Sequence, residues 1–281
     1  MDVGNRHRQA ARTPEAAGPP TAANGSPHAV VWHDLECGAY AADLALWLKL
    51  AARAGPSSAI LDVGAGTGRV TLALARDRHR VTALDLDPDL LEALAERAGS
   101  VPVETICADA RSFSLARQDF DACFIPMQTI QLLGDHDERL AFLRCARAHL
   151  RPDGLLACAI VTAIDPFDCS SGQLGPAPET AVRAGGLYVS RPTRVVVDSG
   201  HVVIERERRI FPTGTDEAPP GAAAERVAGD RFTERNVTEL ALVTAAELQA
   251  EGIEAGLRPL EILEISPTSE HVGSEVVVFG V

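Results

Sequence analysis

A short apolar strand that runs directly into three alternating glycines constrains this chain more than any other feature. The segment Leu61–Val70 reads LDVGAGTGRV and places glycines at 64, 66 and 68. Glycine lets the backbone turn sharply and pass close to a ligand, and such a turn lies at the carboxyl end of a strand in an open α/β sheet. A tight strand-to-helix turn without a ligand is the alternative. The clustering of three glycines favours a ligand-binding turn.

The centre of the chain alternates short apolar runs with amphipathic segments. After the second run, Asp87 and Pro88 begin a segment with Leu90, Leu91 and Leu94 on one side, as expected of a capped helix. Such alternation is typical of βαβ units, whose strands form a parallel sheet. We therefore predict an α/β protein with a Rossmann-like, mostly parallel sheet. The runs that predict its first five strands are 59–63, 80–86, 103–108, 120–126 and 155–162.

Helical periodicity precedes the first predicted strand. Leu44, Trp47, Leu48 and Ala51 share one face of a pattern that runs from residue 31 to 54. This pattern predicts a helix packed ahead of the sheet. Residues 1–27 mix Arg, Ala, Pro, Gly, Thr and Ser without periodicity, and we expect them to form a disordered leader.

The alternation of predicted strands and helices stops after Asp165 and resumes near residue 244. Two β-patterned runs, 187–197 and 202–211, are joined by Asp198-Ser199-Gly200, which predicts a hairpin, and a third candidate strand spans 231–243. We expect a small three-stranded antiparallel cap. Two final strands, near 260–265 and 275–281, would complete a seven-stranded sheet. The predicted division is a leader (1–27), a core (28–164), a cap insertion (165–243) and the completion of the core sheet (244–281).

The composition of the chain indicates which binding partners and which cellular compartment to expect. The formal net charge of −13 opposes attraction to nucleic acid or to an anionic membrane, so a small-molecule substrate is favoured. No apolar run is long enough to span a bilayer. The six cysteines form no CxxC pair, which predicts neither a zinc module nor a disulfide framework and favours the cytoplasm. Lys49 is the only lysine beside many arginines, which suggests a GC-rich bacterial genome. The oligomeric state stays open.

Acidic residues close the two strands that follow the glycine turn. Asp85 lies about 20 residues after it, where a carboxylate can accept hydrogen bonds from a ribose diol. The glycine spacing is GxGxG and not the GxGxxG of dinucleotide-binding folds. Asp109 closes the third strand, beside the same crevice. The glycine turn, Asp85 and Asp109, each at the end of consecutive strands, together resemble the class I S-adenosylmethionine-dependent methyltransferases.

This resemblance implies a strand order of 3-2-1-4-5-7-6 with the seventh strand antiparallel. It also implies that Asp62 and the backbone of Gly64 hold the methionine end of the cofactor, Asp85 the ribose, and Asp109 with Ala110 the adenine. Gly66 and Gly68 would pass beneath the cofactor. Tyr40 resembles an N-terminal segment that folds over the methionine moiety, although simple packing explains it equally well. The cofactor-binding residues predicted in this way are Tyr40, Asp62, Gly64, Ala65, Gly66, Gly68, Asp85, Leu86, Asp109, Ala110 and Met127.

The segment after the fourth predicted strand indicates the class of molecule that would accept the methyl group. It lacks the Asn/Asp-Pro-Pro-aromatic run of enzymes that methylate nucleobases or glutamine amides, and Pro126-Met127-Gln128 resembles the small-molecule branch instead. Met127 would line the methyl-transfer site, with apolar packing as the alternative. The predicted reaction is in-line transfer to N, O or C of a small molecule, with proximity and orientation as the main catalytic effect.

Several alternatives remain at this stage. His33, Glu36 and His271 are possible general bases, and each could equally have a structural role. Asp135, His136 and Asp137 stand where a helix should begin, and because acids there complement the helix dipole we predict no metal site. Arginines of the cap strands could select an acidic acceptor or form a solvated face. An NAD(P)-dependent oxidoreductase and a non-catalytic S-adenosylmethionine-binding protein are the competing functions.

Overall fold

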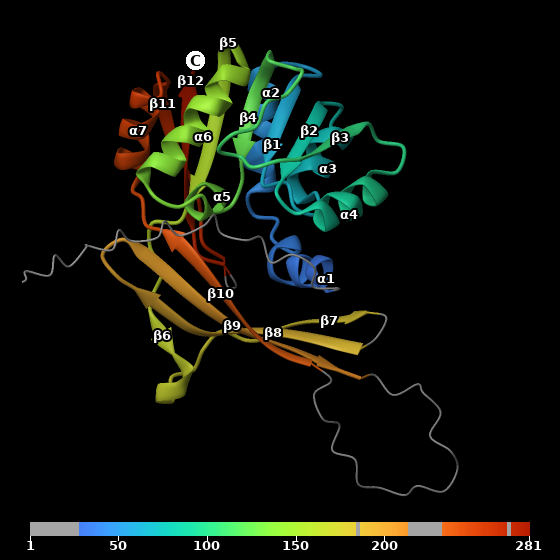
Figure 1. Ribbon diagram of the computed structural model, residues 1–281, viewed down its shortest axis with the longest axis vertical. Helices are drawn as coiled ribbons and strands as arrows, with labels where there is room; N and C mark the ends of the chain where they lie inside the picture. The colour runs from blue at the N-terminus through green and yellow to red at the C-terminus, as the bar shows by residue number, and fades with distance from the viewer. Residues whose placement is uncertain (1–27, 184–185, 213–231, 269–270) are drawn as a thin grey trace, which may run out of the picture.

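The computed structural model describes residues 28–183, 186–212, 232–268 and 271–281, and contains two sheets. The main sheet lies in the upper part of Figure 1 with helices on both faces, and the second sheet lies below it. The predicted leader (1–27) and part of the third predicted cap strand lie outside the described residues. None of the described helices is long and apolar enough to cross a membrane.

The main sheet has seven strands in the order β11-β12-β5-β4-β1-β2-β3. The pairs β1–β2, β2–β3, β1–β4 and β4–β5 are parallel, whereas β12 is antiparallel to both β5 and β11. This order is the predicted 3-2-1-4-5-7-6, so the prediction of fold class is confirmed. The strands are β1 (Ala59–Val63), β2 (Arg80–Asp85), β3 (Val103–Cys107), β4 (Phe120–Ile125), β5 (Leu150–Ile160), β11 (Arg258–Ile265) and β12 (Ser274–Gly280).

Helices cover the two faces because each presents one apolar side to the sheet. On one face, α2 (Leu44–Ala54) and α3 (Arg69–Arg76) bury Trp47 and Leu74 against the strands, and α4 (Pro88–Ala98) packs beside α3. On the other face, α6 (His136–His149) and α7 (Ala245–Glu254) bury Phe142 and Leu248 in a second cluster. A short helix, α5 (Thr129–Leu132), connects β4 to α6.

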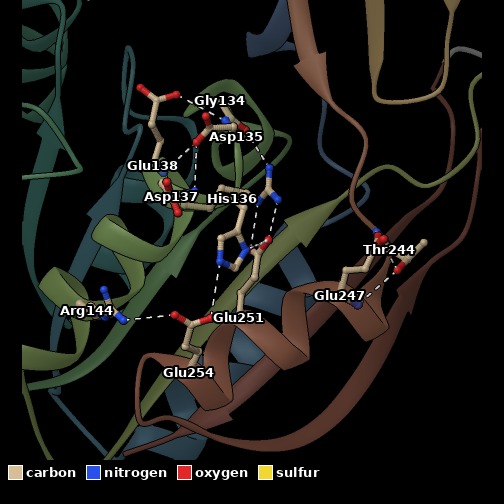
Figure 2. Close-up of polar contacts among 11 residues, drawn as sticks. Gly134, Asp135, His136, Asp137, Glu138, Arg144, Thr244, Glu247, Glu251 and Glu254 are labelled. Carbon is tan, nitrogen blue, oxygen red and sulfur yellow. Dashed lines mark hydrogen bonds and ion pairs between the residues drawn. The ribbon is translucent and has the colours of Figure 1, made fainter.

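Side-chain caps fix the start of α6 and α7. The Asp135 carboxylate accepts hydrogen bonds from the backbone N–H groups of Asp137 (3.0 Å) and Glu138 (3.1 Å), and Thr244 and Glu247 form the corresponding box on α7. His136 turns toward Glu251 and Glu254 of α7 (Figure 2). Capping of the α6 N-terminus therefore accounts for the cluster Asp135, His136 and Asp137. Within the described ranges, no group of three or more His, Cys, Asp or Glu side chains could hold a metal ion.

The cap sheet has five strands, not the predicted three. Its order is β10-β9-β8-β6, and β7 pairs with the same edge of β8. The two strands that the sequence did not predict are short and lie in a Pro/Gly/Ser-rich region without apolar alternation, so they form only because β8 offers an unpaired edge. The cap elements are β6 (Phe167–Asp168), η2 (Cys169–Ser171), β7 (Glu179–Arg183), β8 (Gly186–Val197), β9 (His201–Phe211) and β10 (Phe232–Ala241).

One buried side chain joins the cap to the main sheet at both junctions. Gln131 of α5 donates hydrogen bonds to the carbonyl oxygens of Val161 (3.1 Å), just after β5, and Ala241 (3.0 Å), at the end of β10. Its Oε1 accepts from the Val161 N–H at 2.8 Å. Helix α5 is therefore tied to both ends of the cap.

The single N-terminal helix predicted from periodicity is wrong. Residues before α2 form α1 (Ala29–His33) and a π-helical turn, η1 (Asp34–Gly38), and the chain then turns before α2. Trp32 packs on Tyr188 of the cap with ring centroids 5.0 Å apart, while Trp47 packs in the main core. Since these two indoles belong to different apolar clusters, a break between them lets both be buried. In Figure 1, α1 lies between the main sheet and the cap.

Candidate cofactor site

A cavity of about 390 Å³ lies at the carboxyl ends of β1, β2 and β4. The glycine turn after β1 forms one wall, and the segments after β2, β3 and β4 form the others. His33 and Cys37 of the N-terminal segment also line it. The strand ends that the sequence predicts to share a crevice therefore do so.

All three glycines of the turn have positive φ angles, of 73°, 53° and 95° at 64, 66 and 68. A Cβ on Gly64 would overlap Thr129, one on Gly66 the His33 ring, and one on Gly68 the side chain of Leu94. Gly68 is thus explained by packing of α3 on α4. Gly64 and Gly66 instead bring the backbone against residues that line the cavity.

Asp62 is 1% exposed and is the most unusual charged group of the site. The Thr71 hydroxyl donates to its Oδ2 at 2.5 Å, but its Oδ1 is buried and has no hydrogen-bond partner among the described residues. Burial raises the pKa of Asp62 to about 6. A buried carboxylate oxygen without a hydrogen-bond donor is costly, and Oδ1 of Asp62 therefore leaves an unsatisfied acceptor in a residue of the cavity lining.

Asp85 organises the glycine turn as well as the cavity wall. Its Oδ2 accepts from the backbone N–H of Gly66 at 2.7 Å, and its Oδ1 accepts from that of Asp87 at 3.0 Å. Each oxygen keeps a further lone pair. The neighbouring Leu86 is 46% exposed and lines the cavity.

Asp109 lines the cavity together with an arginine that the sequence reading did not identify. The Arg111 guanidinium donates hydrogen bonds to both carboxylate oxygens of Asp109, the shortest at 2.6 Å, and also forms an ion pair with Glu138. These hydrogen bonds lower the pKa of Asp109. The Asp-x-Arg spacing on a strand end was the available signal.

Comparison with known proteins agrees with this geometry. A family described as "Methyltransferase domain" matches residues 60–154. The cypemycin N-terminal methyltransferase of Streptomyces sp. is 31% identical over 109 residues, which are 39% of this chain and 43% of that protein. A probable ribosomal RNA small subunit methyltransferase A of Methanosarcina acetivorans is 42% identical over 64 residues, which are 22% of this chain and 24% of that protein. The matched region therefore spans less than half of either relative.

Solved structures extend the likeness to the whole fold. A sugar N-methyltransferase from Streptoalloteichus sp. superposes with a TM-score of 0.67 at 20% identity, over 98% of this chain and 99% of that one. Other similar structures are described as S-adenosylmethionine-dependent or as complexes with S-adenosylmethionine. Residues 60–154 match the methyltransferase domain family, and the described residues share the Rossmann-like fold of the similar structures. Both findings agree with the prediction of an S-adenosylmethionine-dependent methyltransferase.

The loop after β4 is strained in this methyltransferase domain. Met127 adopts φ = 55°, which is unfavourable for a side chain of this kind, and lines the cavity with Gln128. The Thr129 hydroxyl donates to the Pro126 carbonyl at 3.0 Å and closes the turn. Strain of this type is maintained where the surrounding structure fixes it, here through α5 and its Gln131 contacts.

Three residues predicted to bind the cofactor, Tyr40, Gly66 and Gly68, lie outside the cavity lining, as does the possible base His271. The Tyr40 ring packs on His271, with centroids 4.7 Å apart, and beneath the Arg69 guanidinium at 5.1 Å. Arg69 itself lines the cavity and is held by the buried Asp43. Tyr40 therefore contacts the cavity lining through Arg69, and His271 contacts only Tyr40 in this group.

The three possible bases separate clearly in space. His33 lines the cavity, whereas Glu36 accepts hydrogen bonds from Arg208 at 2.7 Å and Ser190 at 2.7 Å and fastens the N-terminal segment to the cap.

Among the described residues the cap arginines mostly face carboxylates, so their charge is largely balanced. These pairs are Arg194 with Asp168 and Glu205, Arg206 with Glu179, Arg208 with Glu36 and Glu234, Arg209 with Glu207, and Arg235 with Glu205.

Proposed function

We propose that the protein binds S-adenosylmethionine in this cavity and transfers its methyl group to a small polar molecule. The observation that carries the proposal is the unpaired, buried Oδ1 of Asp62 beside the glycine turn. An ammonium group would supply the missing donor there. Asp85 would accept from the ribose hydroxyls, and Asp109 with Ala110 would border the adenine, so the residues fit the cofactor.

The sulfonium of S-adenosylmethionine supplies a methyl group that is already activated. The protein's own contribution is to hold that group in line with the acceptor and to exclude water. Alignment of this kind lowers a barrier by on the order of 7–11 kcal/mol. The rigid turn at Met127 and the wall formed by His33 and Cys37 support such a role.

The acceptor would lie between the cavity and the inner face of the cap. Asn236 and Thr238 alternate with exposed residues on β10, the strand that contacts α5, and Asn236 pairs with Arg206 of β9. Leu132, at the cavity mouth, is 52% exposed and offers an apolar contact. A surface with both polar and apolar side chains suits a small polar metabolite. The similar structure from Streptoalloteichus sp. is a sugar N-methyltransferase.

Nucleic acid is the less favoured acceptor. The chain has a net charge of −13, and the cap arginines named above are paired with acids. The match to a probable ribosomal RNA methyltransferase covers only 22% of this chain. All six cysteines are free thiols, which supports a reducing, cytoplasmic location.

Calorimetry with S-adenosylmethionine, S-adenosylhomocysteine and NAD(H) tests donor binding. We expect saturable binding of both sulfur ligands and none of NAD(H). Binding of NAD(H) alone would overturn the proposal. A screen of metabolite pools and ribosomal RNA with isotopically labelled donor then tests transfer, and label in RNA alone would refute the small-molecule acceptor.

A further inference from the structure

The side chain of His33 is held in one orientation by a chain of hydrogen bonds that ends outside the cavity. The Thr67 hydroxyl donates to Oδ1 of Asp34 at 2.8 Å, and the same hydroxyl oxygen lies 3.3 Å from Nδ1 of His33. Arg97 grips both oxygens of Asp34, at 2.8 and 2.6 Å. Four residues from α1, η1, the glycine turn and α4 thus form one connected group.

The direction of these bonds determines the protonation pattern of the imidazole. Burial would raise the pKa of Asp34, but the hydrogen bonds from Arg97 and Thr67 outweigh it and keep that pKa below its ordinary value. Asp34 is therefore an acceptor, and the one hydroxyl hydrogen of Thr67 points to it. The Thr67 oxygen can then only accept from Nδ1–H of His33, which leaves the lone pair on Nε2.

The lone-pair side of the ring lies over the glycine turn. A Cβ on Gly66 would overlap Nε2 and Cε1 of His33, so the ring rests directly on the glycine backbone. Nε2 has no hydrogen bond to any described residue, and His33 lines the cavity. Burial also lowers the pKa of His33, against opposing effects of Asp85, Asp34 and Glu36.

We propose that His33, fixed as the Nδ1–H tautomer by Thr67 and Asp34, makes the cavity prefer the positively charged methyl donor over the uncharged product. This inference rests on the proposed function. The donor and the product share the amino-acid, ribose and adenine parts and differ at sulfur by one methyl group and one positive charge. A neutral imidazole offers a lone pair beside that charge, whereas an imidazolium would repel it.

Other charged groups around His33 also act on the charge of the sulfonium, and His33→Gln leaves all of them in place. Asp85 of β2, Asp34 and Glu36 of the N-terminal segment and Arg97 of α4 face the imidazole. Asp62 of β1 titrates near pH 6, but it is expected to contact the ammonium that both ligands carry. The ratio of the two dissociation constants removes effects shared by both ligands and isolates those that depend on the charge of sulfur.

The test is calorimetric titration of the full chain with S-adenosylmethionine and with S-adenosylhomocysteine between about pH 4.5 and 8, a range that extends well below the ordinary pKa of histidine because burial lowers the pKa of His33. In the wild-type protein, the preference for the donor should fall on the order of tenfold as the pH decreases and His33 gains a proton. His33→Gln should make the preference independent of pH. His271→Gln is the matched control, since that histidine lies on Tyr40 outside the cavity, and it should behave as wild type.

A second pair of variants leaves His33 in place. Thr67→Val removes the acceptor for Nδ1–H and should weaken the preference at neutral pH, whereas Thr67→Ser should restore it. A wild-type preference that does not change with pH, or the same pH dependence in His33→Gln, would overturn the inference while leaving donor binding established. If neither ligand binds the wild-type protein at any pH, the proposed function itself fails.

Discussion

Replacing Asp62 with asparagine should separate the stability of the domain from its affinity for the donor. Burial raises the pKa of Asp62 to about 6, from an ordinary 3.8. The unfolded chain releases this proton at a lower pH than the folded protein. The free energy of unfolding therefore falls as the pH rises from 3.8 toward 6, and the loss is complete above that window. The difference between the two pKa values corresponds to about 3 kcal/mol, at about 1.36 kcal/mol per pH unit.

The asparagine variant cannot ionise, so it lacks this pH dependence. Between about pH 4.5 and pH 7, the wild-type protein should lose about 2 kcal/mol of stability relative to Asp62→Asn. Any constant cost of burying the amide cancels when the two pH values are compared. Urea denaturation followed by tryptophan fluorescence measures the difference. The same variant should bind S-adenosylmethionine more weakly by about 1.5–3 kcal/mol, because the ammonium loses a charged acceptor.

Asp119→Asn is the matched control for this experiment. Asp119 is exposed and pairs only with Arg117 among the described residues, so its replacement should change stability by less than about 0.5 kcal/mol and leave donor affinity unchanged. The reasoning fails if the stability of Asp62→Asn follows that of the wild-type protein at every pH. It also fails if the variant binds the donor with unchanged affinity.

Three further substitutions, the last with a matched control, test other parts of the structure. Asp85→Ala removes an acceptor of the glycine turn and of the ribose, so calorimetry should show donor affinity reduced by about 1.5–3 kcal/mol; unchanged affinity would remove Asp85 from the site. Gly66→Ala combines a φ of 53° with overlap of the His33 ring, and should lower the free energy of unfolding by about 1–3 kcal/mol in urea denaturation; wild-type stability would contradict the close approach. Gln131→Met leaves two carbonyls and one N–H unpaired at the cap junctions and should destabilise by about 3 kcal/mol or more in the same assay, whereas Gln128→Met, in the cavity wall, should cost less than about 1 kcal/mol.

The central strands and helices of the main sheet follow from local pattern. Each central strand is a short apolar run, and the helix starts at Asp87 and Thr244 are defined by caps that act within a few residues. The family resemblance then supplied the strand order. The short strands β6 and β7 escaped prediction because their own residues carry no apolar alternation, and each forms by pairing with the edge of β8.

The glycine turn and the acids at strand ends could be assigned to one crevice from sequence because carboxyl ends of parallel strands share an edge. The sequence could not show that Asp62 keeps an unpaired oxygen, that Arg111 grips Asp109, or that only His33 of the three possible bases reaches the cavity. Local pattern fixes which elements form and at which edge their ends lie. Tertiary packing decides how deeply each side chain is buried and which partner it meets, and those two quantities set the charge and chemistry of the site.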